Sequence, residues 1–192
     1  MGDLAERRGL ETTVYEPAED SQLLLEAARE GVTESDRVLE VGTGSGYVAA
    51  ELAAETGARV VGSDLNPYAC RAARERGVQT VRADLVAPFR DGVFDAVLFN
   101  PPYLPRVEDG ERDDWMESAL TGGETGREVI APFLASVGRV LAPGGAVWLV
   151  LSTLTGVEEV RALAREAGFA VRTAREASFP FEKLLVWRLS RH

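Results

Sequence analysis

A glycine-rich loop between a predicted strand and a predicted helix constrains the fold of this chain more than any other feature. The loop runs from Glu40 to Gly46 with the sequence EVGTGSG, after the strand-like residues 37–39 and before the helical stretch 47–54. Glycine tolerates positive φ angles and lets a ligand approach the backbone closely. A strand, a glycine loop and a helix in this order are typical of the ligand-binding edge of an α/β sheet.

The spacing of the loop glycines argues against a dinucleotide. Glycine occupies the first, third and fifth positions, whereas the dinucleotide fingerprint requires glycine at the sixth, where Tyr47 stands. Glu40 would repel a diphosphate but could meet a cationic amino group. Asp64 ends the next predicted strand, where a carboxylate that binds ribose is expected. These features favour a nucleoside that carries an amino-acid tail, which describes S-adenosylmethionine.

A second motif, Asn100-Pro101-Pro102-Tyr103, follows the apolar run 94–99. The two prolines donate no backbone hydrogen bond and keep the chain extended. The oxygen of the Asn100 side chain and a neighbouring carbonyl can then accept both hydrogens of one planar NH2 group, and Tyr103 offers a flat face for stacking. The same four residues also suit an ordinary tight turn, so the functional interpretation depends on their combination with the glycine loop.

Length and composition predict one globular domain. The 192 residues suit a single domain over 1–192, and the hydrophobic fraction of 45% is typical of globular proteins. No apolar run approaches the roughly 18 to 20 residues of a membrane span, and residues 1–8 lack the apolar centre of a signal peptide. We therefore expect a cytoplasmic protein with no membrane contact.

Cysteine, histidine and charge exclude several kinds of chemistry. Cys70 is the single cysteine and His192 the single histidine, so zinc sites of the Cys/His kind and Ser-His or Cys-His nucleophiles are not expected. The net charge is −10 and every basic residue except Lys183 is arginine. Such acidity disfavours nucleic acid as a partner. The scarcity of lysine suggests adaptation to salt, with a GC-rich genome as the alternative.

Strand and helix patterns alternate along the chain, which predicts a parallel sheet covered by helices on both faces. The expected strands are 37–41, 59–63, 78–83, 94–99, 146–151, 170–177 and 183–189, and the expected helices are 17–30, 47–55, 67–76, 126–141 and 157–167. A short turn joins the last two strands, which are therefore antiparallel to each other. We expect a ligand at the carboxyl ends of the strands, where the strand order reverses.

Residues 104–124 form a polar segment too long for a plain connection, and segments of this length are often binding loops. The segment is rich in acidic residues and contains Trp115, an aromatic side chain that needs something to cover it. We predict that 104–124 lies on the substrate side and that residues 1–30 close the cofactor pocket.

Several motifs together resemble the HemK-type class I methyltransferases. They are 15–21 (YEPAEDS), 40–46 (EVGTGSG), 64–67 (DLNP), 84–85 (DL), 100–103 (NPPY), 122–123 (GG) and 126–128 (GRE). The resemblance extends over residues 14–186 and is closest to the short archaeal and eukaryotic branch. Enzymes of that branch methylate the glutamine of the Gly-Gly-Gln loop in translation termination (release) factors. The resemblance implies a Rossmann-like α/β fold with seven mostly parallel strands, one of them antiparallel.

The resemblance also implies roles for individual residues and a partner. The cofactor-binding residues would be Tyr15, Pro17, Asp20, Glu40, Gly42, Gly44, Asp64, Leu65, Asp84, Leu85 and Asn100. The catalytic residues would be Asn100, Pro101 and Tyr103, and the substrate-binding residues Asn100, Pro102, Tyr103 and Trp115. Asp64 would accept the ribose hydroxyls and Asp84 the adenine amino group. A small zinc-containing activator protein would add a strand beside 78–82, at the expected edge of the sheet.

Three other functions remain open. Adenine carries an exocyclic NH2 group like that of a carboxamide, so an adenine-N6 methyltransferase acting on DNA or RNA could use the same Asn100 corner. A protein lysine methyltransferase is a second alternative, although a lysine must first lose a proton and no base is evident in the sequence. A cofactor-binding subunit without catalytic activity is the third, and the intact 100–103 motif argues against it.

Overall fold

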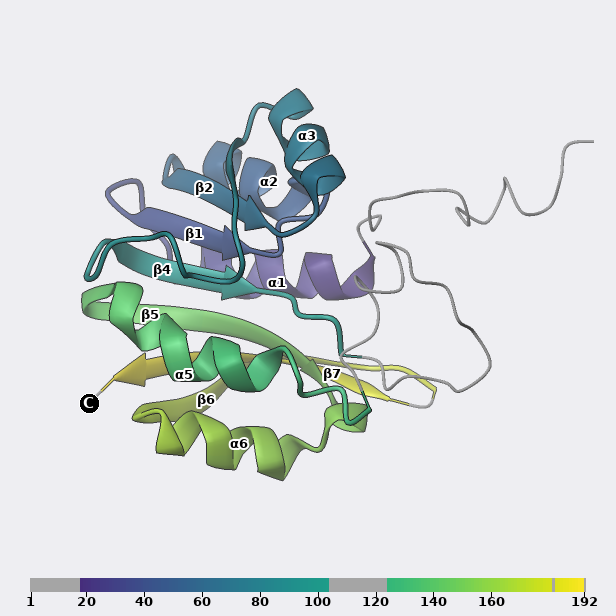
Figure 1. Cartoon of the computed structure of the whole chain (residues 1–192). Helices are drawn as coiled ribbons and strands as arrows, with labels where there is room; N and C mark the ends of the chain where they lie inside the picture. Colours follow the sequence, from purple (N-terminus) through teal and green to yellow (C-terminus); the bar gives the residue numbers. More distant parts are fainter. Residues whose placement is uncertain (1–17, 104–123, 181, 192) are drawn as a thin grey trace, which may run out of the picture.

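The computed structural model describes residues 18–103, 124–180 and 182–191, which form one seven-stranded sheet of order β3-β2-β1-β4-β5-β7-β6 (Figure 1). The strands are β1 (Arg37–Val41), β2 (Arg59–Asp64), β3 (Gln79–Arg82), β4 (Phe94–Phe99), β5 (Leu141–Ser152), β6 (Phe169–Ser178) and β7 (Lys183–Arg191). The helices are α1 (Glu19–Arg29), α2 (Tyr47–Thr56), α3 (Pro67–Glu75), α5 (Ile130–Val140) and α6 (Val157–Glu166), with a short 3-10 turn η2 (Thr153–Thr155).

The pairing of the strands confirms the expected fold class. β1 pairs in parallel with β2 and β4, β2 with β3, and β4 with β5, whereas β7 runs antiparallel to both β5 and β6. The chain leaves β1 towards the β3 edge and returns to β4 on the other side of β1. The strand order therefore reverses between β1 and β4, and this is where α/β sheets bind ligands.

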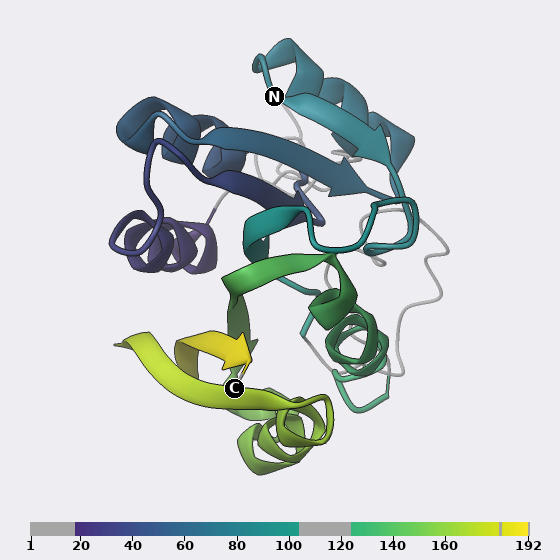
Figure 2. The same cartoon turned by 90° about the vertical axis from the view of Figure 1, so that its left-hand side faces the viewer.

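Helices cover both faces of the sheet (Figure 2). Helices α5 and α6 pack on one face, over a core that includes Leu39 and Val97, while α1 and α2 pack on the other over Val38 and Leu98. Neighbouring strand residues thus point to opposite faces and are buried on both. This explains why the central strands read as unbroken apolar runs in the sequence. Among the described residues, no helix is both long enough and apolar enough to cross a membrane.

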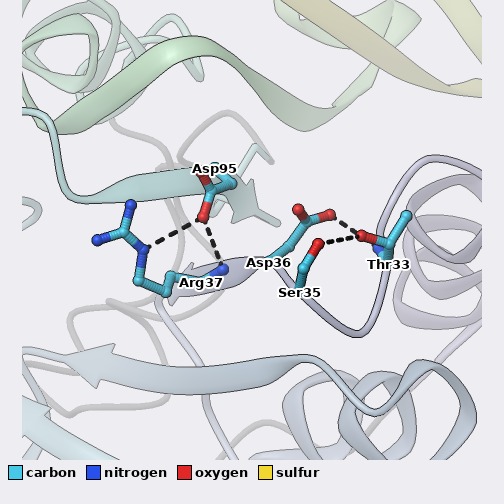
Figure 3. Close-up of polar contacts among 5 residues, drawn as sticks. All are labelled: Thr33, Ser35, Asp36, Arg37 and Asp95. Atoms are coloured by element: carbon cyan, nitrogen blue, oxygen red, sulfur yellow. Dashed lines mark hydrogen bonds and ion pairs between the residues drawn. The ribbon is translucent and has the colours of Figure 1, made fainter.

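Polar contacts at the amino ends of the central strands fix their register (Figure 3). One carboxylate oxygen of Asp95 accepts hydrogen bonds from the backbone nitrogen of Arg37 at 2.9 Å and from its Nε at 3.3 Å. Just before β1, the backbone nitrogen of Thr33 donates to Asp36 at 2.7 Å. With β1 and β4 tied in this way, Val41 pairs with Phe99, and the two strands end side by side.

The structure corrects two predicted helix and strand boundaries. Helix α5 begins at Ile130 instead of 126, because Gly126 has a left-handed φ of 74° that no α-helix accommodates. Strand β5 begins at Leu141 instead of 146, so the segment 143–145 lies within the strand instead of ending the helix before it. A Cβ on Gly145 would lie 2.9 Å from the carbonyl oxygen of Phe94, so only glycine fits there beside β4.

Strand β3 lies at the edge of the sheet, as expected, but it starts at Gln79 instead of Val78. The backbone nitrogen of Val78 donates instead to the carbonyl of Ala73, so Val78 belongs to the turn that ends α3. The remaining elements differ from the predicted ranges only at their ends.

Candidate active site

The glycine loop of residues 42–46 turns the chain from β1 into α2. Gly42, Gly44 and Gly46 all have left-handed φ angles, 64°, 54° and 77°, which explains the three glycines. The backbone nitrogen of Gly46 donates to the carbonyl of Thr43 at 2.8 Å and closes the turn. The resulting backbone is open to close approach by a ligand on its outer side, since Gly42 is exposed.

Glu40 lies beneath this loop and organises it. Its side chain is 4% exposed, and its Oε2 accepts hydrogen bonds from Thr43 Oγ1 at 2.5 Å and from the backbone nitrogen of Ala49 at 3.1 Å. Burial raises the pKa of Glu40 from 4.5 to about 8; the two hydrogen bonds lower it and the nearby Asp64 raises it further. A buried carboxylate with a raised pKa is stabilised by any cation that approaches.

Thr43 is a site residue that the sequence analysis missed. It is buried, its hydroxyl donates to Glu40, and it fills the space left by Gly62, where a Cβ would lie 2.8 Å from Thr43 Oγ1. A hydroxyl three residues after a buried acid was the signal available in the sequence, since this is the spacing at which side chains meet across a turn.

Asp64 ends β2 beside the loop. Its Oδ2 accepts from the backbone nitrogen of Gly44 at 3.0 Å and its Oδ1 from that of Asn66 at 2.9 Å, so the carboxylate shapes both turns. Burial raises the pKa of Asp64, and the backbone bonds oppose the shift. Each carboxylate oxygen has capacity for a further donor. Leu65, the next residue, is 53% exposed and offers an apolar surface at the same place.

The end of β3 brings one further predicted residue, Asp84, to this crevice, whereas the side chain of the predicted cofactor residue Leu85 turns to the core instead. The backbone nitrogen of Ala83 donates to the carbonyl of Asp64 at 2.9 Å, which places the following Asp84 next to the end of β2. Asp84 is exposed. Leu85 has a φ of 48° and is the single non-glycine among the described residues with positive φ; its side chain packs against the core under α5. Such strain in a non-glycine residue often marks a functional site.

Asn100 follows β4 and has an unusual side chain. Its Oδ1 is buried and has no hydrogen-bond partner among the described residues. Among those residues, the Trp187 indole nitrogen in the core is the only other buried side-chain polar atom without a partner. Leaving such a group unsatisfied costs about 1–3 kcal/mol. The oxygen is therefore suited to a donor that arrives with a ligand, while the two following prolines offer no N–H to satisfy it.

Tyr103 is held from two directions. Its hydroxyl donates to Asp20 Oδ2 at 3.2 Å, and the second oxygen of Asp20 accepts from the backbone nitrogen of Ser21 at 2.6 Å. Gly126 passes so close that a Cβ there would lie 2.6 Å from the Tyr103 carbonyl oxygen. The start of α1 and the segment before α5 thus converge on the 100–103 motif, a contact that the sequence analysis did not foresee.

The structure brings most of the predicted residues into one row across the carboxyl ends of β3, β2, β1 and β4. These are Asp84, Asp64, Leu65, Gly44, Glu40, Gly42, Asn100, Pro101, Pro102, Tyr103 and Asp20. A Cβ on Gly42 would lie 4.0 Å from the Asn100 carbonyl oxygen, which joins the glycine loop to the motif. Three predicted residues, Tyr15, Pro17 and Trp115, lie outside the described residues. The described residues contain no group of three metal-ligating side chains.

Comparisons with known proteins agree with this geometry. The model of the methyltransferase domain family matches residues 38–121. A Methanocaldococcus jannaschii protein assigned to the protein N5-glutamine methyltransferases is 38% identical, with 94% of each chain covered. Methyltransferase HEMK2 of Mus musculus is 38% identical, covering 96% of this chain and 92% of its own. The solved Mtq2–Trm112 complex of E. cuniculi, which methylates the termination factor eRF1, matches with a TM-score of 0.78 and 31% identity, over 94% of this chain and 100% of the other.

The order of the strands, together with the row of predicted residues across the carboxyl ends of β3, β2, β1 and β4, defines a class I methyltransferase that uses S-adenosylmethionine. The residues present fit this cofactor: the glycine loop leaves backbone exposed, and Glu40 and Asp64 place carboxylates beside it where a cationic ligand is favoured over a phosphate. With relatives of this identity and coverage, the chain belongs to the HemK-type protein N5-glutamine methyltransferases.

Proposed function

We propose that this enzyme methylates the side-chain nitrogen of a glutamine in the Gly-Gly-Gln loop of a translation termination factor. The observation that carries the proposal is the buried, unpartnered Oδ1 of Asn100 within the described structure. An amide NH2 group donates two hydrogens in one plane, so it can satisfy this oxygen and a neighbouring carbonyl together. The relatives support the substrate, because the M. jannaschii protein is assigned to glutamine methylation and Mtq2–Trm112 methylates eRF1.

The chain's own residues address the main chemical difficulty, which is that an amide nitrogen is a poor nucleophile. Its lone pair is delocalised into the carbonyl. With Asn100 Oδ1 and the Pro101 carbonyl accepting the two N–H groups, the developing positive charge on nitrogen is stabilised most in the transition state. Tyr103 holds the plane of the amide, which supplies orientation. When bound, S-adenosylmethionine would supply an electrophilic methyl group, and the amide nitrogen that accepts it would lose one proton to water.

Two alternative acceptors fit the protein less well. Binding of nucleic acid depends largely on contacts between basic side chains and phosphate groups. The net charge of −10 on this chain opposes such contacts. A lysine acceptor would present a charged ammonium with three hydrogens and would first have to lose a proton. The glutamine amide is neutral and needs no base before transfer.

Mass spectrometry tests the proposed substrate. A termination factor incubated with this protein, its activator and labelled S-adenosylmethionine should gain one methyl group on the glutamine of its Gly-Gly-Gln loop. A factor with asparagine in place of that glutamine is the matched control and should gain none. Label found on a lysine, or on adenine when DNA or RNA is supplied instead, would contradict the assignment.

We also propose that a small zinc-containing activator protein adds a strand to the open edge of β3. Of the four exposed large hydrophobic residues in the described structure, Tyr68 and Val81 lie between the start of α3 and the end of β3, whereas Leu65 lies beside the glycine loop. An unpaired edge strand with exposed apolar side chains is suited to pairing with another chain. The solved structure of the relative Mtq2 is a complex with Trm112.

Charge indicates what kind of surface the activator presents. Arg71, Arg74, Arg76 and Arg82 are all exposed around this edge, although the whole chain is acidic. None of the four forms an ion pair with a carboxylate of the described residues. Backbone carbonyls hold three of them in place, for example Thr80 O for Arg74 at 3.0 Å. A partner with an acidic strand and an apolar contact would complement this surface.

Two substitutions at one position test the edge. The Ala83 nitrogen bonds to β2, so alternation along β3 directs the Thr80 nitrogen to the open edge. Thr80→Pro removes that donor and should abolish co-purification of the activator. Thr80→Ala loses the same hydroxyl bond to the Cys70 carbonyl but keeps the donor, so it should still bind. Arg71→Glu should weaken binding. Equal co-purification of all three variants would rule out this edge.

A further inference from the structure

Tyr103 receives a hydrogen-bond partner from a distant part of the chain. Its hydroxyl donates to Oδ2 of Asp20, which stands in the first turn of α1, at 3.2 Å. Asp20 is only 3% exposed, although a carboxylate is costly to bury without partners. This contact joins the beginning of the described chain to the motif that contains Asn100, across 83 residues of sequence.

The two carboxylate oxygens of Asp20 accept hydrogen bonds from different parts of the chain. Oδ1 accepts from the backbone nitrogen of Ser21 at 2.6 Å and so serves the start of α1, where acidic side chains are generally favourable. Oδ2 accepts the hydrogen bond from the Tyr103 hydroxyl. Glu19 offers the same helix turn a second carboxylate, but it is exposed and makes no such contact in the described structure. A role in the helix alone therefore accounts for one oxygen of Asp20 and leaves the other unexplained.

Other contacts constrain the backbone and the ring of Tyr103. Gly126 approaches its backbone, and its ring packs against the core cluster on the α1 face of the sheet. Two prolines connect it rigidly to Asn100. The hydroxyl bond to Asp20 adds a constraint on the tilt of the ring relative to the Asn100 oxygen.

We infer that Asp20 is a positioning residue for the acceptor: it orients Tyr103, and through it the plane of the glutamine amide, and its carboxylate is not a cofactor ligand. The inference rests on the proposed function, since it assigns Tyr103 to the acceptor. It changes the role expected for Asp20, which the family resemblance placed in the cofactor pocket. A ring tilted away from its position would misplace the amide nitrogen, and a misplacement of about 1 Å can cost about 100-fold in rate.

Steady-state kinetics test the inference. Asp20→Ala should lower kcat by about 10- to 100-fold while the Kd for S-adenosylmethionine, measured by calorimetry, stays within about threefold. Tyr103→Phe removes the other half of the bond and should lower kcat similarly. The double variant should be no worse than either single variant, because both remove one interaction. Additive losses in the double variant would overturn the inference.

Asp20→Asn separates the two possible roles of the side chain. An asparagine amide can donate to the tyrosine hydroxyl, so it should restore much of the kcat lost in Asp20→Ala. If the negative charge of Asp20 met a cationic group of the cofactor, Asp20→Asn would fail as badly as Asp20→Ala and both would raise the Kd. Glu19→Gln is the matched control for losing a carboxylate from the same helix turn and should leave kcat unchanged.

An observation independent of turnover distinguishes this inference from the proposed function. NMR of ring-labelled tyrosine, with only four tyrosines in the chain, should show slow flipping of the Tyr103 ring in the wild type and in Asp20→Asn. Flipping should be faster in Asp20→Ala. If glutamine were not methylated but ring flipping still changed in this way, the proposed substrate would be refuted and the positioning of Tyr103 by Asp20 would be supported. If the flipping rate of the Tyr103 ring were the same in Asp20→Ala as in the wild type, the inference that Asp20 positions Tyr103 would be refuted.

Discussion

Replacing Glu40 with glutamine should change how the free energy of unfolding depends on pH. Burial raises the pKa of Glu40 from 4.5 to about 8 in the folded protein. Between these values the folded chain holds a proton that the unfolded chain has released, so the free energy of unfolding falls as pH rises and levels off above the folded pKa. Each pH unit contributes about 1.4 kcal/mol, so the whole interval amounts to at most about 5 kcal/mol.

The glutamine variant lacks this loss, because its side chain is neutral at every pH and its Oε1 can still accept from Thr43 and Ala49. Urea unfolding of both proteins between pH 5 and 8 gives the difference in free energy of unfolding, variant minus wild type. That difference should rise by about 1.4 kcal/mol per pH unit. Glu26→Gln, on the exposed face of α1, controls for the loss of one carboxylate. A difference that stays constant with pH would refute the argument that Glu40 is protonated in the folded protein.

Four further outcomes are expected. Asn100→Ala should raise the barrier to methyl transfer by about 3 kcal/mol or more and leave cofactor affinity within about threefold; loss of cofactor binding in calorimetry would mean that Asn100 holds the cofactor instead. Asp64→Ala should weaken cofactor binding by about 2–3 kcal/mol, and unchanged affinity would leave Asp64 as a turn residue only. Gly126→Ala should unfold at lower urea concentration and lose activity, because its Cβ would meet the Tyr103 carbonyl oxygen at 2.6 Å. Gly77→Ala has a similar positive φ with nothing within 4 Å, so it isolates the backbone strain and should stay active. Because the net charge is −10, the melting temperature should rise with potassium chloride up to molar concentrations, and a flat profile would favour genome composition as the reason for the single lysine.

Local pattern was sufficient to predict most of the fold. The strands 37–41 and 94–99 were predicted with their observed bounds, because a strand buried on both faces must be continuously apolar and ends where polar loop residues begin. The predicted helix 126–141 was wrong at its start and the predicted strand 146–151 was wrong at its start. At both places the glycine backbone passes close to a segment distant in sequence: Gly126 to Tyr103, and Gly145 to Phe94. No local propensity reports such a contact.

The sequence by itself determined the chemistry available to this protein: three glycines at left-handed positions, the acids Glu40 and Asp64, and an asparagine followed by two prolines. Each of these depends on covalent structure or backbone freedom, which the residue type carries with it. Only the tertiary structure decided how these groups are used. Folding buries Glu40 and raises its pKa, leaves Asn100 Oδ1 without a partner in the described structure, and brings Asp20 to Tyr103. Burial and the pairing of distant groups depend on what the whole chain places around a residue, so they arise only when the sheet and its helices have assembled.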